Sequence, residues 1–252
     1  MKDKKHILWF EEVNAKDTPL VGGKGSSLGE MYGVMPVPNG FCLTVKAYKE
    51  VLHAHHTEFL ELLKKRDIEN LEELEAVANI IKTKIHTVLL PSDVEKSIRE
   101  SYRKLKGKVA VRSSATTEDL EEASFAGQQD TFLNIEGEDA VLEAVKKCWA
   151  SLFNPRAIYY REKNKFAHDT AFLSVVVQKM VAADTAGVMF TMNPINKSRD
   201  EMIIEACFGL GEKLVSGEIT PDTFIVHKND GAVKEEYLNF EKRTLSVEKL
   251  KE

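Results

Sequence analysis

Apolar residues recur at two different periods along this chain, and each period predicts a different kind of element. A short apolar run at 6–10 predicts a strand, and a segment rich in proline and glycine at 36–40 interrupts any helix. From 45 to about 105 the apolar positions lie three or four residues apart, which predicts helices. Ser92 and Glu95 have the spacing of a capping box and predict that the third helix begins there.

Strand patterns return after the helical stretch. The runs "KVAVRSS" and "DTFLNI" predict two strands, and 138–164 then predicts two more helices. Beyond this point the chain consists of short β-rich runs separated by Gly, Pro and Asp, which predicts a second sheet. We therefore expect an α+β protein with a first domain at 1–168, containing a helical insertion, and a second domain at 169–252.

Composition narrows the functional classes. The 252 residues are 43% hydrophobic and 30% charged, with a formal charge of -5, so no global positive field exists to hold DNA or RNA. The three cysteines, Cys42, Cys148 and Cys207, form no C-x-x-C pair, which argues against a disulfide framework or a zinc site. The first residues turn acidic before an apolar segment develops, and no run of eighteen apolar residues follows. We expect a cytoplasmic protein without membrane or nucleic-acid partners.

The segment "VGGKGSSLGEM" places Lys24 among three glycines, directly before a stretch that is compatible with a helix. Glycines allow the backbone to approach an anion closely, and a helix N-terminus offers N–H groups to bind it. The segment is not a Walker A motif, because Thr18 stands where its first Gly should be and Gly25 follows the lysine where Ser or Thr is required. The alternative interpretation is a glycine-rich turn with a solvated lysine.

The segment "VAVRSSATTED" ends a predicted strand with Arg112, whose guanidinium can bind a phosphate with two parallel hydrogen bonds. The hydroxyl groups and small residues that follow can wrap further phosphate oxygens, so the segment could form a lid. Its candidate ligands are Ser113, Ser114, Thr116, Gly127 and Thr131. The alternative is an ordinary polar loop between two strands.

Two further segments supply candidate nucleotide contacts. The strand "SVVVQKMV" could offer a purine an apolar slot with backbone polar groups at its edge, although a plain core strand has the same pattern. The residues concerned are Gln178, Lys179, Met180 and Val181. Glu205 and Glu212 are candidates for ribose or metal contact, and the alternative is that both are solvated surface charges.

Taken in order, these segments resemble a known family. The motifs "GGKGSSLGEM", "VRSSATTEDLEEASFAGQQDTFLN", "SLFNPRAIYYR", "VVVQKMV", "GVMFTMNP" and "GLGEKLVSGEITPD" resemble the N-terminal ATP-binding domain of phosphoenolpyruvate synthases and of the related rifampicin phosphotransferases. The resemblance runs from about residue 8 to about 226, and its "RSSATTED…SFAGQQDT" block is the most specific part.

The resemblance implies an ATP-grasp fold of two subdomains and a dikinase reaction. In that reaction ATP yields AMP and phosphate, while the β-phosphoryl group passes to a histidine on another domain and then to pyruvate or an antibiotic. It also implies roles: Lys24 and Arg112 bind phosphates and are the catalytic candidates, Gly127 and Thr131 belong to the phosphate loop, and 178–181 line the adenine pocket.

The resemblance also implies missing parts. In these families the acidic Mg²⁺ ligands follow in a later segment, so we expect most metal ligands beyond Glu252 and the second subdomain to be truncated. No histidine has the family's phosphocarrier context. We expect a fragment of a longer enzyme or a separate subunit that does not complete the reaction alone. A non-catalytic nucleotide-binding module is the alternative, and the loop at 113–128 is expected to be mobile without nucleotide.

Overall fold

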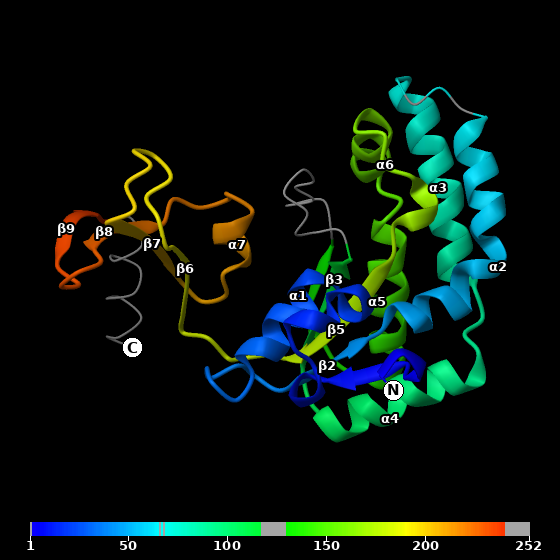
Figure 1. The fold of residues 1–252 in the computed structure, drawn as a ribbon, viewed down its shortest axis with the longest axis horizontal. Helices are drawn as coiled ribbons and strands as arrows, with labels where there is room; N and C mark the ends of the chain where they lie inside the picture. Colours follow the sequence, from blue (N-terminus) through cyan, green and yellow to red (C-terminus); the bar gives the residue numbers. More distant parts are fainter. Residues whose placement is uncertain (1, 66, 68, 117–129, 240–252) are drawn as a thin grey trace, which may run out of the picture. The chain divides into compact units, whose positions relative to one another are not determined.

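The computed structural model describes residues 2–65, 67, 69–116 and 130–239. Internal contacts group the chain into two units, Met1–Met180 and Val181–Glu252 (Figure 1). Within the described parts, no helix has both the length and the apolar character that a bilayer crossing requires.

The first unit is built on a five-stranded antiparallel sheet in the order β1-β2-β5-β3-β4. Its strands are β1 (Ile7–Trp9), β2 (Gly40–Leu43), β3 (Val109–Ala115), β4 (Thr131–Ile135) and β5 (Leu173–Lys179). Strand β5 is almost entirely buried and lies in the middle, between β2 and β3. Strands that are distant in sequence therefore meet side by side along β5.

Helices cover both faces of this sheet (Figure 1). They are α1 (Thr18–Met31), α2 (Val45–Lys64), α3 (Leu71–Thr87), α4 (Ser92–Leu105), α5 (Glu138–Ser151) and α6 (Pro155–Lys163). On one face, Val21 of α1 joins a small cluster with Cys42 and Val176. On the other face, helices α2 to α6 contribute to one large cluster that includes Val109, Val111 and Val177. The alternation along β5 thus feeds two separate apolar clusters, because Val176 joins the small cluster and Val177 the large one.

The predicted helical stretch at 45–105 is confirmed as α2, α3 and α4, but the predicted capping box is wrong. Pro91, with extended backbone angles, occupies the N-cap position of α4, and no side chain caps the helix. Ser92 is already the first helical residue, so its hydroxyl is one position too late to act as an N-cap.

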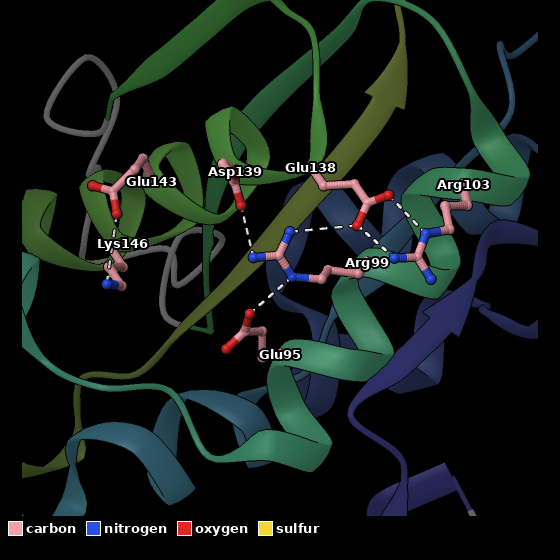
Figure 2. A network of polar contacts seen from close by, with 7 residues as sticks. All are labelled: Glu95, Arg99, Arg103, Glu138, Asp139, Glu143 and Lys146. Carbon is pink, nitrogen blue, oxygen red and sulfur yellow. Dashed lines mark hydrogen bonds and ion pairs between the residues drawn. The ribbon is translucent and has the colours of Figure 1, made fainter.

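An ion-pair network joins α4 to the start of α5 (Figure 2). Arg99 contacts Glu95 at 2.8 Å within its own helix and Asp139 at 2.7 Å on α5. Glu138 lies between Arg99, at 3.4 Å, and Arg103, at 2.6 Å. None of these residues belongs to the large apolar cluster. Their charge-assisted hydrogen bonds fix how α4 lies against α5, but exposed ion pairs add little to the free energy of folding.

The second unit is a four-stranded antiparallel meander in the order β6-β7-β8-β9, and its described part, 181–239, has one short helix. The elements are β6 (Thr185–Phe190), β7 (Glu201–Phe208), α7 (Glu212–Val215), β8 (Asp222–His227) and β9 (Val233–Tyr237). The mixture of helices and two antiparallel sheets confirms the predicted α+β class. Strand β9 was not predicted, because "VKEEY" is exposed at every position and carries no apolar period.

The unit boundary differs from the predicted domain boundary by one strand. Sequence patterns placed the boundary between 168 and 169, which assigns β5 to the second domain, whereas β5 pairs with β2 and β3 in the first sheet. An apolar run shows that a segment is buried but not which sheet it joins, because pairing between β5 and β2 links residues more than 130 positions apart.

Candidate functional site

The glycine-lysine segment lies inside α1, at a break in the helix. Gly22 has a φ of 71° and a ψ of 175°, so one helical turn ends there and a second helical stretch begins at Gly23. A Cβ atom on Gly22 would lie 2.4 Å from both the carbonyl oxygen and the hydroxyl oxygen of Ser114. The prediction that a helix follows the glycines is thus confirmed, and the close approach involves strand β3.

Ser114 holds this break against the sheet. Its hydroxyl donates to the carbonyl oxygen of Val21 at 2.8 Å and accepts from the N–H of Gly25 at 3.1 Å. The side chain is fully buried. The predicted phosphate ligand Ser114 therefore bonds to both sides of the helix break, and its hydroxyl is engaged within the protein.

Lys24 is half-buried in the first turn after the break. The charge of Lys24 affects the thiol of Cys148 on α5. Burial raises the pKa of this thiol, the carboxylate of Asp130 raises it further, and the ammonium of Lys24 lowers it. Both charges therefore act on the same thiol.

Arg112 and Thr131 share one face of the first sheet. Arg112 of β3 pairs directly with Thr131 of β4 on one side and with Val176 of β5 on the other. Directly paired residues of antiparallel strands project to the same face, and Val176 belongs to the cluster that α1 covers. Arg112, which is half-buried, and the exposed Thr131 thus lie on the face that carries the helix break.

Two other predicted ligands make local hydrogen bonds. The hydroxyl of Ser113 donates to the carbonyl oxygen of Asp130 at 3.2 Å, and its side chain is buried on the opposite face from Arg112. The N–H of Thr116 donates to the carbonyl oxygen of Phe172 at 3.3 Å. Gly127 and most of the predicted lid lie outside the described residues.

The predicted adenine segment begins at the end of β5 and continues two residues beyond it. Gln178 pairs with Ala110 and Gly40, and its side-chain amide donates to the carbonyl oxygen of Pro38 at 3.1 Å. The N–H groups of Lys179 and Met180 donate to Asn39 and Lys108, each at 2.9 Å. The exposed Val181 begins the second unit. A purine at this strand end would thus meet side chains and carbonyl groups rather than the amides of Lys179 and Met180.

The two predicted carboxylates belong to the second unit. Glu205 is half-buried in β7, where it pairs with Val188 and Thr223, and Glu212 is exposed at the first residue of α7. The most firmly bound carboxylate in this sheet is Glu201, which sequence patterns did not single out. It accepts from Asn193 at 2.8 Å, from Asn196 at 2.9 Å and from Lys234 at 2.7 Å.

Asp130 was also missed, although it lies within the motif that carries the resemblance. Its backbone carbonyl accepts from both the N–H and the hydroxyl of Ser113, and its carboxylate accepts from Asn154 at 3.4 Å. The sequence did offer one signal for Asp130, which is its position directly before the candidate phosphate ligand Thr131. Asp130 thus directly precedes the residue that pairs with Arg112.

Potential metal ligands gather elsewhere in the first unit. Within the described ranges, the group of three is His6, Glu50 and Asp93. The ammonium of Lys46 lies 2.6 Å from the imidazole of His6 and 2.7 Å from Glu50, so a cation already occupies the centre of this group. It combines the residue before β1 with residues of α2 and α4, and none of its members is a residue predicted to bind nucleotide.

On one face of the first sheet, α1 therefore carries a glycine break followed by Lys24 and the start of a helix, and Arg112 of β3 projects to the same face. A helix start attracts anions through its N–H groups and its dipole, and an arginine beside it can bind two oxygens at once. Such a set suits an anion with several oxygens, such as a polyphosphate.

Comparisons with known proteins point the same way. Residues 18–252 match the family model described as pyruvate phosphate dikinase, AMP/ATP-binding domain. The chain is 41% identical to phosphoenolpyruvate synthase of Pyrococcus furiosus, over 93% of this chain and 34% of that protein. It is 47% identical to probable phosphoenolpyruvate synthases of Methanocaldococcus jannaschii, over 89% of this chain and 20% of that protein, and of Archaeoglobus fulgidus, over 91% and 32%. The chain thus spans between a fifth and about a third of the length of these relatives.

Proposed function

Because this chain belongs to the family of pyruvate phosphate dikinase AMP/ATP-binding domains, we propose that it binds ATP as the nucleotide-binding part of a phosphoenolpyruvate synthase-type phosphotransferase. The proposal rests on the packing of the glycine break of α1, which Lys24 follows, on the face of the sheet to which Arg112 projects. The relatives' names supply the class of reaction, and the residues of this chain supply the binding chemistry.

The phosphates would lie over the face shared by α1 and Arg112. Lys24 and Arg112 neutralise negative charge there, and the start of the helical stretch after Gly22 adds backbone dipoles. Ser114 acts indirectly, because it holds the glycine break at the distance from β3 that its two hydrogen bonds require. Thr131, paired with Arg112, offers a hydroxyl on the same face.

The base would lie toward the end of β5. Gln178 lies two residues along β5 from Val176, which pairs with Arg112, so it is about 7 Å farther along the sheet. Met180 and Val181 provide apolar contact at this strand end, and Lys179 an additional cation. Glu205 and Glu212 remain candidates for ribose or Mg²⁺ contact, with further Mg²⁺ ligands expected outside this chain.

The wider proposal concerns the complete enzyme. The two units would correspond to the two subdomains of an ATP-grasp fold. When bound, ATP supplies a β-phosphoryl group for a histidine on another domain or subunit, with AMP and phosphate as products and pyruvate as the final acceptor. This chain's residues bind the nucleotide and balance its charge, which is the main protein contribution in phosphoryl transfer.

Titration calorimetry of the 252-residue chain with ATP and Mg²⁺ tests the proposal. Lys24→Ala and Arg112→Ala should each weaken ATP binding about 10- to 100-fold, since each removes a charge-assisted contact. Arg103→Ala is the matched control, because it removes an exposed cation whose partner is Glu138 on the other side of the sheet. Equal ATP affinity in all three variants would contradict the proposal.

The alternatives are a rifampicin phosphotransferase and a non-catalytic nucleotide-binding module, and the names of the relatives favour neither. They differ in product and acceptor. Combined with a phosphohistidine domain and pyruvate, a catalytic chain should produce AMP, whereas a binding module should not. AMP formation with a rifamycin but not with pyruvate would favour the first alternative.

A further inference from the structure

A network of polar contacts lies on the opposite face of the first sheet from Arg112. Arg112 pairs with Val176 of the small cluster, whereas its neighbour Ser113 pairs with Val175 of the large cluster. Because paired residues of antiparallel strands share a face, the buried side chain of Ser113 points toward helices α2 to α6. A contact made there can hold Arg112 and its partner Thr131 in place without touching a ligand on their own face.

Asp130 joins Ser113 to the connection between α5 and α6. Its carbonyl oxygen accepts from the N–H of Ser113 at 3.3 Å and from its hydroxyl at 3.2 Å. Its carboxylate accepts from the side-chain amide of Asn154 at 3.4 Å. Asp130 directly precedes Thr131, so its backbone and its side chain are both held one residue away from the partner of Arg112.

Asn154 extends the network to helix α3. Its side-chain oxygen accepts from the ammonium of Lys82 at 2.9 Å, while its side-chain nitrogen donates to Asp130. The amide dipole thus lies between a cation and a carboxylate, and the two hydrogen bonds strengthen each other. The reverse orientation would turn the NH₂ group toward an ammonium and the oxygen toward a carboxylate, so the two partners fix one orientation of this side chain.

Asn154 stands at the N-cap position of α6 but does not cap the helix with its side chain. Asparagine is a preferred N-cap residue because its side-chain oxygen can accept from a backbone N–H of the first turn. Asn70, at the N-cap position of α3, makes this kind of contact to two backbone N–H groups. Helix α6 thus forgoes a capping hydrogen bond, and the same side chain bridges Lys82 and Asp130 instead.

We propose that Asn154 and Asp130 are positioning residues for ATP binding, and that Lys82 links them to the helical insertion. This inference rests on the proposed function. The network holds the start of β4 against β3, and it thereby keeps the hydroxyl of Thr131 beside the guanidinium of Arg112. Groups that are already in place lose less conformational entropy when a ligand binds. Weakening the network should therefore lower ATP affinity although no contact with ATP is removed.

Calorimetry of the 252-residue chain with ATP and Mg²⁺ measures this effect. Asn154→Ala and Lys82→Met should each weaken ATP binding about 3- to 30-fold, the range expected of residues that act on a site through a connected network. Lys84→Met is the matched control, because Lys84 lies on the same helix and contacts Glu58 instead. It should leave ATP affinity unchanged, and a loss equal to that of Lys82→Met would overturn the inference.

Two variants of Asp130 separate positioning from direct contact with the ligand. Asp130→Asn keeps an oxygen that can accept from Asn154, and the carbonyl group that binds Ser113 belongs to the backbone, so ATP affinity should be retained. Asp130→Ala removes that oxygen and should weaken ATP binding as Asn154→Ala does. Combining both alanine substitutions should weaken it no further, because each removes the same contact. Equal losses in Asp130→Asn and Asp130→Ala would overturn the inference, since the charge itself would then act on the ligand.

NMR spectra of the nucleotide-free chain separate positioning from a general structural role. In Asn154→Ala the side-chain Nε–H signal of Arg112 and the amide signal of Thr131 should shift, while the amide signals of β1 and β2 stay in place. Shifts spread evenly over the first unit would overturn the inference. ATP affinity that Asn154→Ala leaves unchanged would overturn it as well, with the proposed function still standing. Absence of ATP binding by the unsubstituted chain would instead overturn the proposed function, and this inference with it.

Discussion

The two sheets of this protein differ in what covers them. In the first unit, helices pack on both faces of the sheet, and apolar side chains from β2 and β5 are buried on each side. In the second unit, large apolar side chains such as Met189, Phe190 and Phe208 are about half exposed, and β9 is exposed throughout. The first sheet is therefore stabilised mainly by packing, whereas the second has fewer buried apolar contacts for its length.

Polar contacts play different parts in the two units as well. In the first, the buried hydroxyl of Ser114 fixes a backbone break inside an apolar layer. In the second, Glu201 ties Asn193 and Asn196 of the β6–β7 connection to Lys234 of β9. The proposed phosphate site therefore lies on a closely packed sheet. The second sheet depends on the hydrogen bonds of one carboxylate, Glu201, which reach the edge strand β9.

The largest expected effect comes from deleting a core side chain in each unit. Ile81→Ala should lower the free energy of unfolding of the first unit by about 4 kcal/mol, because Ile81 is fully buried in the large cluster. Ile203→Ala should cost the second unit nearer to about 2 kcal/mol, since its surroundings are less enclosed.

Separate probes make this measurement possible. Both tryptophans, Trp9 and Trp149, lie in the first unit, so their fluorescence in urea reports on that unit alone. Hydrogen exchange of the β7 amides reports on the second. If both isoleucine variants lose the same free energy, the contrast between the two units is wrong.

The backbone break at Gly22 should give the next largest effect. Gly22→Ala requires a left-handed backbone with a side chain and places Cβ 2.4 Å from Ser114, so we expect a loss of about 3 kcal/mol. Gly107→Ala is the matched control, because Gly107 has a similar φ of 75° with nothing within 4 Å of the added atom. Its loss should be only about 1 kcal/mol. Equal losses in the urea midpoint would mean that contact with β3 contributes nothing.

Sequence patterns predicted individual elements well where the signal is local. The helices at 45–105 have a clear three-to-four residue period, and β1, β3, β4 and β5 of the first sheet fall within predicted apolar runs. Strand β2 was not predicted, because it follows a segment rich in proline and glycine. The glycine cluster likewise predicted a helix start near Lys24, because only glycine tolerates the backbone angles of Gly22.

Pairing and side-chain partners could not be predicted in this way. The assignment of β5 to the first sheet depends on contacts with β2 and β3 that no local period encodes. Ser113, Ser114 and Thr116 were grouped by composition, yet each makes a different hydrogen bond, and Ser114 bonds across 93 residues to Val21. The same limit explains why Asp130 and Glu201 were missed, since a carboxylate's partners are set by the fold.

Arg112→Lys should have a smaller effect than the deletions above, and it falls on binding rather than on stability. We expect ATP affinity to drop about tenfold although the charge is kept, because lysine cannot form two parallel hydrogen bonds with a phosphate. The urea midpoint should change little, since Arg112 is only half-buried. Calorimetry with ATP and Mg²⁺ measures the change, and Lys24→Arg provides the reverse control. Unchanged ATP affinity in Arg112→Lys would mean that only the charge of this side chain matters.

The smallest effect, confined to acid pH, tests the anchor of the second sheet. Hydrogen bonds from Lys234, Asn196 and Asn193 lower the pKa of Glu201 to about 2. Since the folded pKa lies below the ordinary value of 4.5, the carboxylate stabilises the second unit fully above about pH 4.5 and loses this contribution as the pH falls toward 2.

Glu201→Gln should therefore remove this acid dependence and leave the second unit less protected at neutral pH. Hydrogen exchange of β7, corrected for the intrinsic effect of pH, measures both changes. Glu236→Gln, on the exposed strand β9, is the control and should keep the wild-type profile. If Glu201→Gln and the wild type lose protection over the same pH range, another carboxylate must carry the effect. The second sheet would then depend on its apolar contacts, as the first one does.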